Sequence, residues 1–437
     1  MRIAVVGALL LAPACGDAVA TAETGTTGTS TGAAVPTTSG VSASDTGPMA
    51  TETGMAATTS EGSSSDTGAQ PDGCGDGVPE IDVACFVRVE IPEVRGAERV
   101  VADFDGDGAI DLALEQGDLV RIAFGNGAGG FAVVQEVPLG AIITYVDRFT
   151  PADVDGDADV DLQLASSDRV FVLINDGFGT FEVDLVAPSP APYLEVFVDA
   201  TADGVPELVA NSYSVDPPNA PELRVHRREG AVFVKQPWAG PFPGCYGSAL
   251  ARIDFNQDAF EDVLVASSCN DPKPLSPVNL FLGTGQASFT QTVSAIVGSD
   301  PVVIAVSDFD GDGREDFATA NQFGDDISVV LRDDEGFAAE IRVGGICEGC
   351  GSPNTLVAGD FDGNGVADEL VVHFGAPAPG FPDHLIMNPV AGGPLVTFEL
   401  AAHGSRLLAV ADLNGDGVDD IATTGDQLAL VLFLSDP

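Results

Sequence analysis

Short apolar stretches alternate with acidic, glycine-containing turns through residues 85–437. One unit holds Val100–Ala102, an acidic turn, Leu112–Leu114 and Leu119–Phe124, and then a glycine-rich turn followed by a fourth stretch. That fourth stretch opens on an aromatic residue in several units, at Phe131, Phe181, Phe289 and Phe337. Stretches of this length between turn residues predict β-strands, four to a unit, and the inner ones are apolar enough to be packed on both faces.

The acidic turn recurs seven times, and this internal repeat is the most informative feature of the sequence. Its clearest copy runs from Asp103 to Leu112, and the copy from Asp308 to Phe317 matches it closely. Intervals of 46 to 55 residues separate the first aspartates of the copies, which are Asp103, Asp153, Asp199, Asp254, Asp308, Asp360 and Asp412. Each interval fits one four-stranded blade, so the sequence predicts an all-β fold, a seven-bladed β-propeller.

The two ends of the repeat region predict how the ring closes. The last unit stops after its third strand, Leu428–Leu434, whereas Cys85–Ile91 precedes the first unit as a strand without a blade of its own. We expect this N-terminal strand to complete the C-terminal blade, because pairing the two ends hides strand edges that otherwise invite aggregation.

The aspartate series and the paired turn glycines resemble the FG-GAP (VCBS-type) repeats of integrin α-chain propellers and of many bacterial surface proteins. The resemblance covers residues 85–437. The copy from Asp199 to Glu207 departs most from the pattern, since Thr201 stands at the second ligand position and Glu207 at the last.

Carboxylates at alternating positions of a tight turn direct hard oxygen atoms to one point, which is a calcium geometry, and the intervening glycines allow the backbone to turn. In the first loop we expect side-chain ligands from Asp103, Asp105, Asp107 and Asp111, with the carbonyl of Ala109. An EF-hand begins similarly, but its twelfth position needs a glutamate and here holds Leu114, followed by a strand. Magnesium is less suited to an all-protein oxygen cage.

The series predicts about six calcium sites and leaves the Asp199 loop outside that count. Uncompensated carboxylates within one turn repel, so we expect the ions to be structural; the alternative is a set of solvated, metal-free turns. The expected ligands of the other five loops are Asp153, Asp155, Asp157, Asp159, Asp161, Asp254, Asn256, Asp258, Phe260, Asp262, Asp308, Asp310, Asp312, Arg314, Asp316, Asp360, Asp362, Asn364, Val366, Asp368, Asp412, Asn414, Asp416, Val418 and Asp420.

Charge and composition agree with cation binding. The 437 residues carry 67 Asp and Glu against 17 Lys and Arg, a formal net charge of −50, which argues against nucleic acid or an anionic membrane surface as a partner. Hydrophobic residues nevertheless make up 45% of the chain, enough to build a core.

The N-terminus predicts export. Arg2 is followed by an apolar run, Ile3–Ala12, that is too short to span a bilayer and ends shortly before Cys15. The segment resembles a bacterial lipoprotein signal, which implies lipidation of Cys15; Gly16 then implies the outer membrane, surface-exposed or periplasmic, and ordinary cleavage with secretion is the alternative. The predicted organisation is a signal at 1–14, a Ser/Thr/Gly-rich disordered linker at 15–72, a cysteine-bracketed segment with the closing strand at 73–97, and the propeller at 98–437.

Six cysteines besides Cys15 predict disulfides in an exported chain. We expect Cys74 to pair with Cys85 across a small loop, and Cys245 with Cys269 in the fourth blade. Cys347 and Cys350 have redox-motif spacing, but no βαβ pattern surrounds them, so a structural bridge is favoured.

Long loops on the face opposite the acidic turns predict where a partner binds. Loops of variable length on a rigid scaffold usually carry recognition, although such loops can also be solvent-exposed padding. They hold a scarce supply of aromatic and basic side chains, Tyr213, Phe242, Tyr246, Lys273, Phe381 and His384. We therefore expect a monomeric, calcium-binding recognition or adhesion module at the cell surface, with a protein or glycan ligand.

Signals for catalysis are weak. A GxSxG match at residues 28–32 lies in the linker, without a strand or helix around it. The histidines at 226, 373, 384 and 403 lack metal spacing. No enzyme is predicted; the alternatives are a polysaccharide lyase or hydrolase, which would need a basic pocket, and a purely structural envelope protein.

Overall fold

The computed structural model describes residues 86–96, 99–141, 146–166, 169–188, 194–213, 221–230, 232–241, 246–268, 275–334, 336–344, 352–375, 384–386, 389–390, 397–399, 407–424 and 429–435. Every regular element in these residues is a β-strand. Accordingly, this part of the chain contains no helix of a length and apolarity that could cross a membrane.

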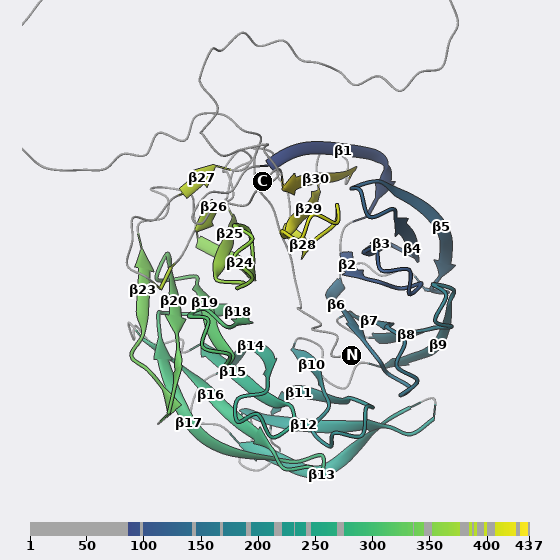
Figure 1. Cartoon of the computed structure of the whole chain (residues 1–437). Helices are drawn as coiled ribbons and strands as arrows, with labels where there is room; N and C mark the ends of the chain where they lie inside the picture. Colours follow the sequence, from purple (N-terminus) through teal and green to yellow (C-terminus); the bar gives the residue numbers. More distant parts are fainter. Residues whose placement is uncertain are drawn as a thin grey trace, which may run out of the picture.

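Seven antiparallel sheets of four strands stand around a ring, each with its first strand nearest the centre (Figure 1). This confirms the predicted propeller. Blades 1 to 3 contain β2 (Arg99–Ala102), β3 (Asp111–Gln116), β4 (Leu119–Gly125) and β5 (Phe131–Pro138); β6 (Val146–Ala152), β7 (Asp161–Ser166), β8 (Arg169–Asn175) and β9 (Phe181–Pro188); β10 (Glu195–Val198), β11 (Glu207–Tyr213), β12 (Pro221–Arg228) and β13 (Phe233–Pro241).

Blades 4 to 6 follow in chain order. They contain β14 (Tyr246–Ile253), β15 (Asp262–Ser268), β16 (Ser276–Gly283) and β17 (Phe289–Val297); β18 (Pro301–Ser307), β19 (Asp316–Asn321), β20 (Asp326–Val330) and β23 (Ile341–Gly344); β24 (Ser352–Gly359), β25 (Glu369–Gly375), β26 (His384–Ile386) and β27 (Thr397–Glu399).

Blade 7 joins the two ends of the repeat region, as the sequence predicts. Its strands β28 (Leu407–Ala411), β29 (Asp420–Thr424) and β30 (Ala429–Ser435) are completed by β1 (Phe86–Arg95). The pairing of β1 with β30 runs from Phe86 opposite Ser435 to Ile91 opposite Leu430. Phe86 and Leu432 are buried in the same apolar cluster, so side-chain packing as well as backbone pairing closes the ring.

Burial follows the position of each strand in its blade. The second strands β3 and β19 are buried along almost their whole length, which explains their continuous apolar sequence. The outer strand β17 has exposed residues through its middle and buried residues at its ends. Apolar clusters join neighbouring blades, so the core is a ring of inter-blade layers.

The fourth strand of blade 5 differs from the prediction at Phe337. This residue belongs to the short β22 (Gly336–Phe337), which pairs with β21 (Arg332–Asp333) in a separate two-stranded sheet. The fourth strand of the blade begins only at Ile341. Phe337 nevertheless packs against Phe317 at a ring-centroid distance of 5.1 Å, so it keeps the apolar role that the repeat predicts.

Candidate metal centres

The seven acidic loops connect the first and second strands of the blades, and they lie next to one another around one face of the ring. Gln257 Nε2 of the fourth loop donates a hydrogen bond to the carbonyl of Gly313 in the fifth (2.9 Å). The N–H of Gly129 in the glycine-rich turn of blade 1 donates to the carbonyl of Leu413 in the seventh loop (3.0 Å).

In five of the seven loops, the final aspartate is an almost completely buried carboxylate. In the first loop, Asp111 accepts the N–H of Phe104 (2.9 Å) on one oxygen and that of Gly125 (2.9 Å) on the other. It thus joins the loop to the end of the third strand. The same two-sided arrangement is made by Asp161, Asp262, Asp316 and Asp420.

The first aspartate of the loop holds the turn from the other side. Asp103 accepts the N–H groups of Gly106 (2.8 Å) and Gly108 (3.1 Å). Both glycines have positive φ, 74° and 92°, a conformation that costs glycine little. The N–H of each expected carbonyl ligand donates to the side chain two residues earlier, at Ala109, Asp159, Phe260, Arg314, Val366 and Val418.

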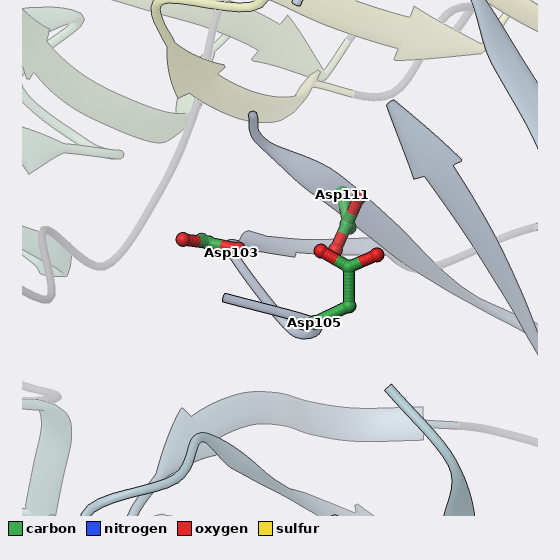
Figure 2. Close-up of side chains that lie close together, drawn as sticks. All are labelled: Asp103, Asp105 and Asp111. Atoms are coloured by element: carbon green, nitrogen blue, oxygen red, sulfur yellow. The ribbon is translucent and has the colours of Figure 1, made fainter. Parts of the chain in front are cut away.

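Three carboxylates converge in four of the loops, with one oxygen from each lying within 4.8 Å of the others. Figure 2 shows the group in the first loop, where Asp103, Asp105 and Asp111 come from the loop and the start of β3. The other groups are Asp153, Asp155 and Asp161; Asp308, Asp310 and Asp316; and Asp360, Asp362 and Glu369. The third acidic positions of the first two loops, Asp107 and Asp157, are exposed and lie outside these groups.

Burial makes the charged form of the innermost carboxylates costly. It raises the pKa of Asp111 and Asp316 to about 6, and that of Asp161, Asp262 and Asp420 to about 7. The neighbouring aspartates of each loop raise these pKa values further, and the two backbone hydrogen bonds lower them. A divalent cation would reverse this balance by stabilising all the negative charges together.

The fourth and seventh loops keep the buried carboxylate, but their three acidic side chains do not form such a group among the described residues. In the fourth loop, Asn256 Nδ2 donates to Asp258 (2.8 Å). In the seventh, Ser435 Oγ lies 2.7 Å from Asp416 and 2.8 Å from Asp420, so its one proton can be donated to either carboxylate. Side-chain donors within the blade thus contact the carboxylates of both loops.

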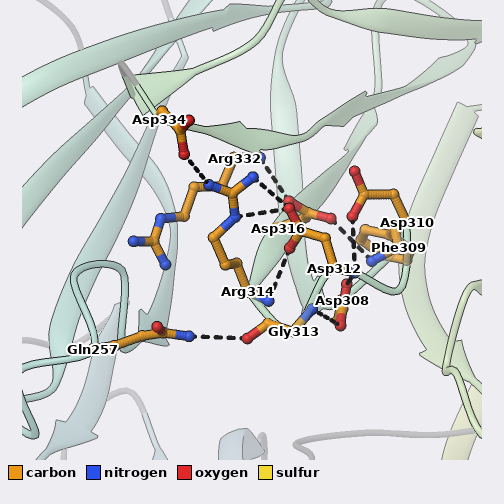
Figure 3. A network of polar contacts seen from close by, with 10 residues as sticks. All are labelled: Gln257, Asp308, Phe309, Asp310, Asp312, Gly313, Arg314, Asp316, Arg332 and Asp334. Carbon is orange, nitrogen blue, oxygen red and sulfur yellow. Dashed lines mark hydrogen bonds and ion pairs between the residues drawn. The ribbon is translucent and has the colours of Figure 1, made fainter.

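In the fifth loop an arginine competes for one of the predicted ligands. Arg314 pairs with Asp312 and reaches Asp334 (3.0 Å), as Figure 3 shows. Asp308, Asp310 and Asp316 still converge without Asp312.

The sixth loop places Glu369 where the repeat predicts Asp368. Glu369 accepts the N–H of Phe361 (3.0 Å), the bond that the final aspartate makes elsewhere, and it is the first residue of β25. The strand pairing of Gly359 with Glu369 leaves one more residue in this loop than the pairing of Ala102 with Asp111 leaves in the first. Asp368 instead accepts a hydrogen bond from Asn364 (3.3 Å). The successive acidic residues Asp368 and Glu369 are the feature of the sequence from which this exchange of roles could have been predicted.

An arginine on a neighbouring strand supplies a positive charge to the third loop. Arg227, on β12, pairs with Asp203 and lies 3.7 Å from Glu207, measured from Nε to Oε1. Glu207 is fully buried, and burial raises its pKa to about 7, which Arg227 partly offsets. The guanidinium thus lies against two acidic residues of this loop. The loop is the one that the sequence did not place among the expected calcium sites.

Substituting Arg227 should destabilise the protein without involving any other loop. In Arg227→Ala, Glu207 is buried without its counter-charge, so we expect the free energy of unfolding at pH 7.5 to fall by about 1–3 kcal/mol in urea denaturation. Arg121→Ala is the control, because Arg121 forms a surface pair with Glu136 and should change stability by less than about 0.5 kcal/mol. Equal losses in the two variants would contradict this role of Arg227.

Acidic residues next to the loop ends also join neighbouring blades, a role that sequence reasoning missed. The carboxylate of Glu261 accepts the N–H of Asp199 (2.8 Å), and that of Glu315 accepts the N–H of Asp254 (2.6 Å). Each acid immediately precedes the final aspartate of the next loop. In the sequence, each is visible as a second carboxylate beside the final aspartate, at a position that the calcium-ligand pattern does not use.

The predicted partner residues are only partly covered by the structure. Tyr246, the first residue of β14, is 52% exposed. Tyr213 and His384 belong to β11 and β26, but their side chains are outside the described part. Phe242, Lys273 and Phe381, together with Cys15 and the other six cysteines, Cys74, Cys85, Cys245, Cys269, Cys347 and Cys350, lie outside the described residues.

Comparison with known proteins supports the repeat and the fold. Residues 103–163 and 254–319 match the family described as FG-GAP-like repeat, so the chain carries FG-GAP-like repeats. No curated protein matches.

Three solved structures are similar to this chain. BBS1N, in a complex with ARL6DN, is 14% identical, with a TM-score of 0.50 over 80% of this chain and 95% of that chain. A Tc holotoxin pore of Photorhabdus luminescens is 15% identical, with a TM-score of 0.42 over 81% and 14%. An Agrocybe aegerita lectin, described with recognition of non-reducing terminal N-acetylglucosamine, is 14% identical, with a TM-score of 0.44 over 81% and 87%. At these identities, the likeness to BBS1N concerns the fold alone.

Proposed function

We propose that this seven-bladed propeller with FG-GAP-like repeats is an exported calcium-binding module that recognises a protein or glycan at the cell surface. The convergence of three carboxylates in each of four loops is the observation that carries the calcium part of this proposal. Hard oxygen donors without nitrogen or sulfur suit Ca²⁺, which accepts flexible oxygen cages. On a chain of net charge −50, bound cations also reduce self-repulsion.

The recognition part rests on the face opposite the acidic loops. Tyr246 begins a first strand there, while Leu275 and Phe323 lie in connections between second and third strands. Leu275 is 44% and Phe323 73% exposed. Aromatic side chains are enriched in protein interfaces, and these exposed residues support the assignment of this face. In this proposal, calcium fixes the scaffold and the opposite face contacts the partner.

Location is the third part of the proposal. The N-terminal segment and Cys15 support export and lipid anchoring, with the Ser/Thr/Gly-rich residues 15–72 as a tether. A module held in this way would meet millimolar calcium outside the cell, the range in which extracellular calcium sites work.

Calcium binding and ligand recognition can be tested on the same protein. Isothermal titration calorimetry, on the protein from which a chelator has removed calcium, should give between four and six bound ions. Four is the number of convergent groups, and six is the number of sites predicted from the sequence. A glycan array and a surface-protein pull-down, each with and without EDTA, should then reveal a ligand in calcium only. A chain that binds no ion at millimolar calcium would refute the proposal.

Tyr246→Ala examines the proposed recognition face. We expect it to weaken adhesion at least tenfold while leaving the melting temperature unchanged. Val134→Ala, an exposed position on the outer strand β5, is the matched control and should bind normally. If both variants bind equally well, Tyr246 does not contribute to partner binding.

A further inference from the structure

The acidic group in the sixth loop is the most buried of the four. In the loops of blades 1, 2 and 5, only the final aspartate is buried, whereas here both Asp362 and Glu369 are. Asp362 is 2% exposed and Glu369 is inaccessible. More of the charge in this loop has therefore been removed from water.

Among the described residues, two of its buried oxygen atoms have no hydrogen-bond partner. These are Oδ1 of Asp360 and Oε1 of Glu369. The second oxygen of each carboxylate does have a partner, the N–H of Gly365 (2.8 Å) for Asp360 and that of Phe361 (3.0 Å) for Glu369. Buried polar atoms are rarely left unsatisfied, and orphaned oxygens in a convergent acidic group indicate a cation between them.

The same loop adjoins the place where the ring closes. Phe361 packs against Phe86 of the N-terminal strand β1 at a ring-centroid distance of 6.1 Å, and both rings belong to one buried cluster. The backbone of Asp360 is also tied to blade 7. Its N–H donates to Asp419 (2.9 Å), and its carbonyl accepts the N–H of Asp419 (2.9 Å).

We propose that a calcium ion bound by Asp360, Asp362 and Glu369 fastens the closure of the ring and is the last ion to leave the protein. This inference rests on the proposed calcium binding, and it assigns Glu369 rather than Asp368 as the ligand. The ion holds both ends of the loop, and through Phe361 and Asp419 it holds β1 and blade 7 against blade 6. Among the described residues, the convergent loops of blades 2 and 5 contribute nothing to the cluster that buries β1, and the first loop reaches it through Ile110.

Affinity order follows from burial. An empty site with two buried carboxylates and two orphaned oxygens is less stable than one whose second carboxylate is in water, so the ion gains more on entering it. The exposed Asp155 and Asp310 of the second and fifth loops indicate weaker sites. Chelation should therefore empty those loops first and the sixth loop last.

The test counts bound calcium and follows hydrogen exchange in β1 while EGTA is added stepwise to the full chain. In the wild type, we expect β1 to stay protected until the last ion is removed. Glu369→Gln keeps the side-chain shape and an oxygen that can accept the Phe361 N–H. It should lose one ion, the tightest, and exchange at least tenfold faster in β1 even in millimolar calcium.

Two control variants separate this inference from calcium binding in general. Asp161→Asn removes the equivalent carboxylate of blade 2 and should lose one ion without changing exchange in β1, while Asp368→Asn should keep every ion. Exchange in β1 that rises equally in Glu369→Gln and Asp161→Asn, or an unchanged ion count in Glu369→Gln, would overturn the proposal. A wild-type chain without bound calcium would instead refute the proposed function. If Glu369→Gln does not fold, the wild-type titration decides: loss of protection before the last ion leaves contradicts the inference.

Discussion

Removing calcium should lower the melting temperature of the whole chain by on the order of 20 °C. An ion present at 100 times its Kd stabilises the folded state by roughly 2.7 kcal/mol, so four convergent groups together contribute about 11 kcal/mol. The entire free energy of unfolding of a globular domain is about 5–15 kcal/mol. Differential scanning calorimetry with millimolar calcium and with EDTA measures the difference directly.

Nonspecific screening is the competing explanation for such a shift, because a chain of net charge −50 is stabilised by any added cation. Sodium chloride at matched ionic strength and magnesium at the calcium concentration are therefore the controls. We expect magnesium to restore only a minor part of the loss, since it prefers a small octahedral shell that retains water. Equal recovery in magnesium and calcium would assign the effect to screening.

The architecture could be predicted from the sequence because its signal is repeated. Seven copies of one turn average out the irregularity of any single blade, and the unpaired strand before Asp103 matches the strand missing after Leu434. Local departures do not share this advantage. Phe337 opens a strand by analogy with other blades, but its hairpin with β21 separates it from the blade edge.

The site was predictable where it depends on spacing and not where it depends on contacts across blades. The converging aspartates of the first loop follow from alternation within one turn. Glu369 does not, because an extra residue in its loop changes which side chain reaches the interior. Arg227 lies 24 residues from Asp203 in sequence, and only the strand pairing of blade 3 brings them together.

Acid should stabilise the metal-free protein, in contrast to the usual behaviour of carboxylate-rich domains. Burial holds the pKa values of Asp161, Asp262 and Asp420 at about 7, above those of an unfolded chain near 4. Between these pH values the folded state binds more protons than the unfolded state, so the free energy of unfolding rises as pH falls from about 7 towards 4. This stabilisation by protonation is lost as the pH rises through 7.

One buried base opposes this trend. Burial lowers the pKa of His226 to about 4, with Lys235 and Arg224 lowering it further, so below pH 6.5 the unfolded state binds the extra proton and stability is lost. The carboxylates outnumber it, since burial also raises the pKa of Asp111 and Asp316 to about 6. In EDTA, we therefore expect a higher melting temperature at pH 5 than at pH 7.5.

Calcium should invert the sign of this dependence. Bound carboxylates must be deprotonated, so protons compete with the ion, and the calcium-loaded protein gains stability from pH 5 to 7.5 while the metal-free protein loses it. The stabilisation by calcium should thus be smallest at pH 5 and largest at pH 7.5. Melting curves at several pH values, with calcium and with EDTA, give both slopes. Parallel slopes in the two conditions would mean that the ions and the protons do not share the buried carboxylates of the loops.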